Sequence, residues 1–203
     1  MNQLKKDLHA FQVNSIAANQ VLPEVSEHIE PIFQGKVISL QVDTVRLPDG
    51  ETGTREVVKH PGAVAVLAIH DDKMVVVEQY RVALGRSQIE VPAGKLNGNE
   101  DIWEAACREL KEETGYIASD WKHLYSCYTS PGFADEFIHL FLAESLIEGD
   151  ADPDEDEFLE SFEITLEQAI KLISNGTISD AKTILCVLAW QHYRMTGSIL
   201  GSI

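Results

Sequence analysis

The sequence predicts an α+β fold with a mixed β-sheet and a β-rich extension at its N-terminal end. Segments with the two-residue alternation of strands occur beside segments with the helical period. They do not follow the strict strand–helix alternation of an all-parallel sheet. The 203 residues suffice for one substantial core, or for one domain with a small extension. We therefore expect residues 1–58 to form the extension and residues 59–203 to form the main domain.

The N-terminal third of the chain is the less regular part. A short helix is expected near residues 5–19, where the pattern is weakly periodic. Residues 34–58 are expected to form a hairpin or small sheet, because apolar and polar positions alternate from Ile38 to Asp43. A Pro-Asp-Gly turn signal at 48–50 separates the two strand candidates. This antiparallel segment is the predicted β extension.

The remaining sequence supplies the strands and helices of the main domain. Apolar or alternating runs bounded by turn residues predict strands at 62–69, 74–80, 88–91, 121–128, 137–143 and 158–164. Helices are predicted at 100–113, from Thr165 to Gly176 with Gln168 at capping-box spacing, and from Ser179 or Asp180 to about Met195. These elements together predict one mixed sheet with helices packed against it.

The charge of the chain limits its partners. Lys and Arg number 16 and Asp and Glu number 33, so the formal net charge is −17. Such a surface repels nucleic-acid backbones and anionic membranes, and we expect neither as a partner. The longest apolar run, about Ala63–Ile69, is far shorter than a membrane span, and the three cysteines are widely spaced. We therefore expect a cytoplasmic protein.

An acidic helix carries the strongest chemical signal. Glu109, Glu112 and Glu113 occupy positions i, i+3 and i+4 and share one helix face, where their charges repel. Most charged helix faces are merely solvated. Here, however, glycines bracket the acidic segment, and a strand–loop junction at Ala93 precedes it. Carboxylates and a loop carbonyl form a suitable partial shell for a hard divalent cation, so we expect a metal site that offsets the repulsion.

The segment from Gly94 to Tyr116 resembles the Nudix box. The matching positions are Gly94, Glu100, Arg108, Glu109, Leu110, Glu112, Glu113 and Gly115, and only Tyr116 departs, where the family has an aliphatic residue. The resemblance implies the Nudix fold, in which helices sandwich a mixed sheet. It also implies hydrolysis, dependent on Mg²⁺ or Mn²⁺, of a nucleoside diphosphate linked to another group.

The Nudix resemblance assigns roles to the box residues. The metal ligands would be Glu109, Glu113 and the carbonyl of Ala93, with Glu112 as a ligand or an immediate neighbour. About two or three ions are expected per site. Arg108, which we place with Glu112 in the catalytic set, would orient the loop and helix together with Glu100.

The flanking sequence resembles the ADP-ribose pyrophosphatase branch of that family. Pro131 lies 15 residues beyond the box, and the segments YTSPGFADE, TREVVKHPGAVAV and EQYR are similar to those of that branch. The resemblance covers about residues 33–195 and implies cleavage of ADP-ribose to AMP and ribose 5-phosphate.

The general base is expected in the acidic segment at residues 150–157. A run such as DADPDEDE is often only a solvated turn. The resemblance, however, implies a catalytic glutamate on a loop in this part of the chain. Glu155 is our first choice for the base, with Glu157 as a metal contact. The two roles are exchangeable, because alternating acids leave the register open.

The resemblance also implies the substrate-binding residues. Arg81 would contact the pyrophosphate or a ribose, through the paired donors of its guanidinium. Arg55 and Glu56 would recognise adenine from the neighbouring subunit of a homodimer, with the N-terminal sheet as a swapped arm. Glu136 would bind the terminal ribose and Phe133 would pack there.

Two alternatives stay open. The first is a Nudix pyrophosphatase for another nucleoside diphosphate sugar, such as a GDP- or UDP-sugar. The second is a non-catalytic module that senses a nucleotide. Such modules usually lose a box glutamate, whereas Glu109, Glu112 and Glu113 are all present here.

Overall fold

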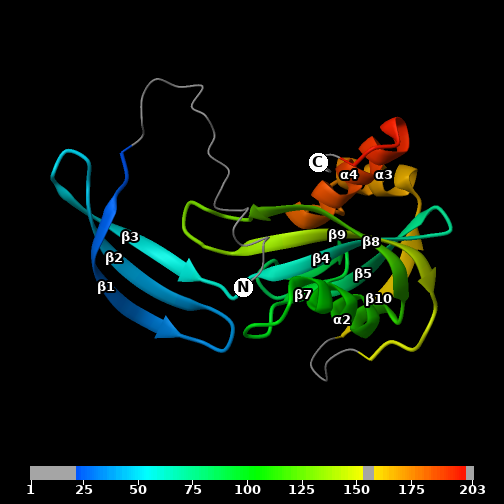
Figure 1. The fold of residues 1–203 in the computed structure, drawn as a ribbon, viewed down its shortest axis with the longest axis horizontal. Helices are drawn as coiled ribbons and strands as arrows, with labels where there is room; N and C mark the ends of the chain where they lie inside the picture. The colour runs from blue at the N-terminus through cyan, green and yellow to red at the C-terminus, as the bar shows by residue number, and fades with distance from the viewer. Residues whose placement is uncertain (1–21, 153–157, 200–203) are drawn as a thin grey trace.

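The computed structural model describes residues 22–152 and 158–199. The expected helix at 5–19 and the acids Glu155 and Glu157 lie outside the described residues. The chain forms a three-stranded arm, which Figure 1 shows at one end of the molecule, and a larger body of sheet and helices at the other end. No helix in these two ranges is long and apolar enough to cross a bilayer.

The arm is an antiparallel sheet in the order β1-β2-β3, formed by Val25–Gln34, Ser39–Arg46 and Thr52–Lys59. The sequence predicted sheet structure at 34–58 but missed β1. Every residue of β1 is exposed, and two register shifts interrupt its pairing with β2. A strand without a buried face has no two-residue apolar alternation, which is the signal by which strands are recognised in a sequence.

The body is built on a seven-stranded mixed sheet in the order β10-β5-β4-β9-β8, with β6 paired to β5 and β7 to β4. The strands are β4 Ala63–His70, β5 Lys73–Arg81, β6 Arg86–Glu90, β7 Ala93–Lys95, β8 Ile117–Tyr128, β9 Phe137–Ile147 and β10 Leu159–Ile164. Only the β4–β9 pairing is parallel among these described strands. The predicted mixed sheet is therefore confirmed. The short β7 was not predicted.

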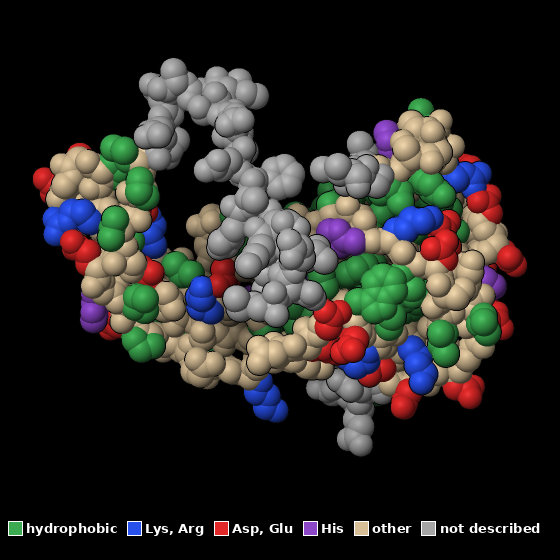
Figure 2. Space-filling model, viewed as in Figure 1, with side chains coloured by type: hydrophobic (Ala, Val, Ile, Leu, Met, Phe, Trp, Pro, Cys, Tyr) green, Lys and Arg blue, Asp and Glu red, His purple; other side chains and the backbone are tan. Residues whose placement is uncertain are grey.

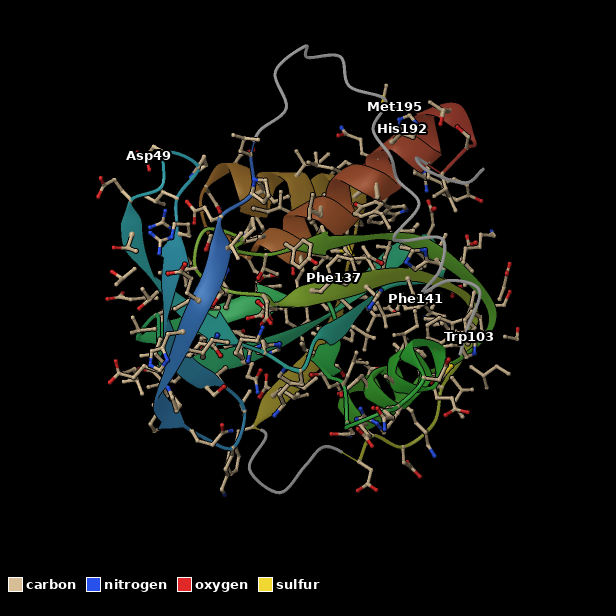
Figure 3. The ribbon with its side chains drawn as sticks, turned by 60° about the vertical axis from the view of Figure 1, so that its left-hand side comes forward. Asp49, Trp103, Phe137, Phe141, His192 and Met195 are labelled. Atoms are coloured by element: carbon tan, nitrogen blue, oxygen red, sulfur yellow. The ribbon has the colours of Figure 1, made fainter. Side chains whose placement is uncertain are left out.

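Helices cover both faces of this sheet. Helix α2 (Ile102–Thr114) packs on one face, and α3 (Leu166–Ser174) and α4 (Ala181–Thr196) pack on the other. Strand β4 is buried on both sides, since Val64 and Val66 face α2 whereas Ala65 and Leu67 face the other helices. Figure 3 shows Trp103 of α2 beside Phe141 of β9, with ring centroids 6.1 Å apart. The predicted sandwich is thus confirmed.

Local capping explains where these helices begin and end. Asp101 caps the start of α2 by accepting from the Trp103 N–H, and Gly115 ends it in the left-handed conformation at φ 77°. The predicted capping box of Thr165 and Gln168 is present in α3. Asp180, one of the two predicted residues, caps α4.

Candidate metal and substrate site

The acidic face of α2 lies directly against the backbone of β7. A Cβ atom built on Gly94 would stand 1.9 Å from both Cδ and Oε1 of Glu109. No side chain fits in that space, so residue 94 must be glycine for the Glu109 carboxylate to reach the loop backbone. The first glycine of the box is therefore fixed by close approach and not by turn geometry.

Two carboxylates are buried at this junction. Glu109 is 7% exposed and Glu113 is 3% exposed. The Ala93 N–H donates a 3.1 Å hydrogen bond to Oε2 of Glu113. Buried carboxylates need compensating partners, and these two lie beside the backbone of Ala93 and Gly94. The structure thus places Ala93, Glu109 and Glu113 at one junction, and their role as metal ligands stays a prediction.

Arg108 supplies positive charge to the same cluster. Its Nη1 lies 2.8 Å from Oε1 of Glu109 and 2.7 Å from Oε2 of Glu112, and its Nε donates a 2.8 Å bond to Glu100. The hydrogen bonds to Glu100, and then those to Glu112 and Glu109, raise the pKa of Arg108 against the opposing effect of burial. Repulsion among the helix acids therefore does not by itself require a metal ion, because Arg108 already offsets part of it.

The donor set still suits a hard divalent cation. Within residues 22–152 and 158–199, no three His, Cys, Asp or Glu side chains are already gathered around one ion position. Arg108 holds the Glu112 carboxylate, and the predicted ligand Glu157 is not among the residues described. Carboxylate oxygens are nevertheless ligands that Mg²⁺ and Mn²⁺ prefer, and the carboxylates of Glu109 and Glu113 lie where α2 meets β7.

The acidic segment after β9 begins on the end of α2. The Asp152 N–H donates to the carbonyl oxygen of Glu112 over 3.0 Å. A Cβ on Gly115 would lie only 2.3 Å from the Gly149 carbonyl oxygen, so the two stretches of backbone touch. The chain that leads to Glu155 and Glu157 therefore starts beside the box helix, although those two residues lie beyond the described part.

Arg81 lies in a buried charge network that the sequence did not predict. Its Nε and Nη2 each donate a 2.7 Å bond to Glu90, which is 3% exposed, and Lys182 of α4 donates to the same carboxylate. The bond to Glu90 is the largest cause of the raised pKa of Arg81, and the charge of Glu113 adds to it. Glu90 and Lys182 lie 92 positions apart, so no local pattern could have paired them.

The predicted ribose-binding loop, residues 129–136, is attached to the end of β3. The Val58 N–H donates to the Phe133 carbonyl over 2.8 Å, and the Asp135 N–H donates to the Val58 carbonyl over 3.1 Å. The Asp135 carboxylate also accepts from the His60 N–H at 2.8 Å. Phe133 has an exposed side chain, and Glu136 lies 3.7 Å from Nε2 of His60. The loop and the arm are therefore joined within one chain.

The predicted adenine-binding pair lies on the arm. Arg55 and Glu56 are exposed neighbours on β3, and Arg55 donates to Glu24. In Figure 1 the arm stands apart from α2, so one chain does not bring this pair to the box acids. Among the described residues, the predicted site residues thus lie around α2 and β7, at Arg81 beside Glu90, and on β3 and the 129–136 loop.

Tyr116, the position that departs from the box pattern, has a polar role. Its hydroxyl lies 3.2 Å from Glu163 of β10 and 3.3 Å from His70 of β4. Burial and then the Glu163 hydrogen bond raise the pKa of Tyr116 to about 12. The residue fastens the end of α2 to two strands, which an aliphatic side chain would do by packing alone.

Comparisons with known proteins agree with this architecture. Residues 59–185 match the model of the NUDIX domain, and residues 30–58 match the nucleoside diphosphate sugar hydrolase N-terminal domain. The ADP-ribose pyrophosphatase of Bacillus subtilis (strain 168) is 52% identical over 78% of this chain and 87% of its own length. The methanol dehydrogenase activator of Bacillus methanolicus is also 52% identical, with the same coverage.

A solved structure supports the fold independently. A crystal structure of an ADP compounds hydrolase superposes with a TM-score of 0.78 and covers 89% of this chain and 99% of that one. At 20% sequence identity, this likeness shows the shared fold alone.

Proposed function

The chain belongs to the NUDIX domain family, and on that premise we propose that it hydrolyses the diphosphate of ADP-ribose to AMP and ribose 5-phosphate. The observation that carries the proposal is the pair of buried acids, Glu109 and Glu113, held against the backbone of β7 at Ala93 and Gly94. The 52% identity to an ADP-ribose pyrophosphatase supports the choice of substrate.

Nudix hydrolases use divalent metal ions, and here we propose Mg²⁺, with Mn²⁺ able to replace it. Glu109, Glu113 and the Ala93 carbonyl would hold about two or three ions, with Glu112 and Glu157 completing the set. Bound metal would neutralise the diphosphate charge that a −17 protein otherwise repels, polarise the phosphoryl oxygens and acidify a water molecule.

The residues of the chain supply the remaining chemistry. Glu155 would accept the proton of the attacking water as its oxygen bonds to phosphorus and the bond to the bridging oxygen breaks. Glu157 is the alternative base. The hydrogen bonds of Arg108 to Glu100 and Glu112 would keep the loop and helix in one geometry during this step.

The substrate contacts complete the proposal. Arg81 would bind the diphosphate, and Phe133 and Glu136 would contact the terminal ribose. Arg55 and Glu56 would bind adenine in the site of a second subunit, because the arm that carries them stands away from α2. We therefore propose a homodimer with an exchanged arm, acting in the cytoplasm.

The arm has the surface that a partner subunit would cover. Figure 2 shows hydrophobic side chains exposed along it. They include Val25, Ile29, Ile32 and Phe33, each more than half exposed. Exposed apolar groups gathered on one small sheet mark an interaction surface.

A substrate panel tests the proposal. Purified protein is assayed with ADP-ribose, GDP-mannose and UDP-glucose in Mg²⁺ and in EDTA, and the products are separated by chromatography. We expect AMP and ribose 5-phosphate only with metal, and the highest kcat/KM for ADP-ribose. Much faster cleavage of a GDP- or UDP-sugar would show that the substrate assignment is wrong.

A regulatory role is the second candidate function. The relative named as a methanol dehydrogenase activator is as similar to this chain as the pyrophosphatase relative is. By its name, that relative acts on another enzyme. All the box acids are nevertheless present in this chain. Binding of ADP-ribose without turnover in either Mg²⁺ or Mn²⁺ would favour regulation over hydrolysis.

A further inference from the structure

Four charged side chains form a chain of ion pairs between the β5–β6 hairpin and the start of α4. This Glu90 quartet consists of Arg81, Glu90, Asp180 and Lys182. Glu90 accepts from Arg81 and from Lys182, and Lys182 also lies 3.1 Å from Asp180. Two positive and two negative groups balance, so the quartet adds no net charge to a strongly acidic protein.

Stability alone does not account for such a group. Glu90 is 3% exposed, and the Lys182 side chain is 14% exposed. Removing charges from water is unfavourable, and well-packed apolar residues are often as stabilising as a buried ion pair. We therefore expect the network to hold one of its side chains in a fixed orientation.

Arg81 is the member that reaches the surface. Its side chain is 40% exposed, whereas that of Glu90 is 4% exposed. Both bonds to Glu90 use the Nε–Nη2 edge, so the Nη1 donors lie outside the pair. A guanidinium fixed along one edge keeps further N–H donors in a rigid plane for a phosphate.

The same stretch of backbone connects the quartet to the box acids. Beyond Glu90, the Val91 N–H donates a 2.9 Å bond to Oγ1 of Thr183 on α4. Two residues further on, the Ala93 N–H donates to Glu113. Helix α4 thus holds Glu90 and Val91, and Glu113 of α2 holds Ala93 at the box end of the same stretch.

We propose that Glu90 and Lys182 are positioning residues, which hold the Arg81 guanidinium in the orientation that binds the substrate diphosphate. Glu90 acts by its two hydrogen bonds to Arg81, and Lys182 acts by fixing Glu90. The inference rests on the proposed function, and it assigns to α4 a part in substrate binding.

The test compares Glu90→Gln with Glu144→Gln, the same change in a carboxylate that is 27% exposed and pairs with Lys122 on β8. We expect Glu90→Gln to raise KM for ADP-ribose about tenfold with a smaller change in kcat, and Glu144→Gln to change KM less than about twofold. Calorimetric binding of ADP-ribose in EDTA should weaken in parallel for Glu90→Gln. This binding readout does not depend on turnover.

A double-mutant cycle separates positioning from a general structural effect. In an Arg81→Ala background, Glu90→Gln should change KM less than about twofold, because its effect acts through Arg81. The proposal is overturned if Glu90→Gln behaves as Glu144→Gln does, or if the effects of Arg81→Ala and Glu90→Gln multiply.

Lys182 provides a second route if Glu90→Gln does not fold. Lys182→Met should raise KM and Lys182→Arg should restore it, with Lys122→Met as the matched control. Equal KM values for Lys182→Met and the wild type overturn the proposal. A wild-type protein that cleaves no nucleotide sugar contradicts the proposed function itself, whereas failure of the variants alone contradicts only the positioning role.

Discussion

The Asp152 N–H donates a hydrogen bond to the carbonyl oxygen of Glu112, so the segment that leads to the proposed base starts on the last turn of the box helix. The backbone therefore connects the box helix directly to the start of the segment that carries the proposed loop acids. Gly115 stands at this connection, where its Cα approaches the Gly149 carbonyl.

Gly115→Ala should reduce activity through this contact. The new Cβ would lie 2.3 Å from the Gly149 carbonyl oxygen, and φ is 77°. Gly176→Ala is the matched control, because φ is 78° there and a Cβ added at that position would meet no atom within 4 Å. The positive φ should cost each variant about 1 kcal/mol of unfolding free energy in urea titrations, and Gly115→Ala should lose more because the backbone of residues 149–151 must move. Only Gly115→Ala should lose kcat, by about tenfold or more, and equal kcat values would contradict this contact role.

Gly94→Ala should disable the site without altering a charged residue. The added methyl group must displace the Glu109 carboxylate, which lies 1.9 Å from its position. We expect kcat/KM for ADP-ribose to fall about a hundredfold. Gly176→Ala, whose added methyl group would meet no atom within 4 Å and which lies between α3 and α4, is the control and should keep kcat/KM near the wild type. A Gly94→Ala protein with normal kcat/KM would show that Glu109 need not touch this backbone.

Glu113→Gln tests the proposed ligand set. Loss of this buried carboxylate should lower kcat on the order of a thousandfold and raise the Mg²⁺ concentration needed for half-maximal rate. Glu104→Gln changes an exposed acid of the same helix and should have little effect. The rates are measured over a Mg²⁺ titration. A near-normal rate for Glu113→Gln would refute the ligand assignment.

His139 should make the stability depend on pH. Burial, and then the neighbouring His123, lower the pKa of His139 from 6.5 to about 4. Between these values the unfolded chain binds more protons than the folded chain, so stability falls as the pH drops from about 6.5 toward 4. Because the ring is partly exposed, we expect a loss of about 1–2 kcal/mol. Urea titrations at pH 7.5 and 4.5 should show a smaller loss in His139→Gln, and an equal loss would contradict the prediction.

The sequence predicted the features that depend on local signals. Helix α2 was found because its acids, its apolar stripe and Gly115 all lie within one short segment. Strand β1 was missed because it is exposed along its whole length, and β7 because three residues are too few to show a period. The Glu90–Lys182 pair was missed because only the packing of α4 beside β6 brings these residues together.

The predicted substrate residues show the same limit. The loop with Phe133 was recognised from its own residues, but its attachment to Val58 of β3 is a contact across the fold. Arg55 and Glu56 lie on the arm away from α2, and their expected action in a neighbouring subunit, which came from the resemblance, stays a prediction. Their placement becomes meaningful only together with the proposed second subunit.

The hydroxyl of Tyr116 has a consequence for recognising distant relatives. At this position the hydroxyl of a tyrosine forms hydrogen bonds with Glu163 and His70. The end of the helix can therefore be held by polar contacts as well as by the packing of an aliphatic side chain. A search pattern that demands an aliphatic residue after the final box glycine would pass over chains built like this one. Permitting tyrosine there, when a histidine and a glutamate occupy the facing strands, would retrieve them.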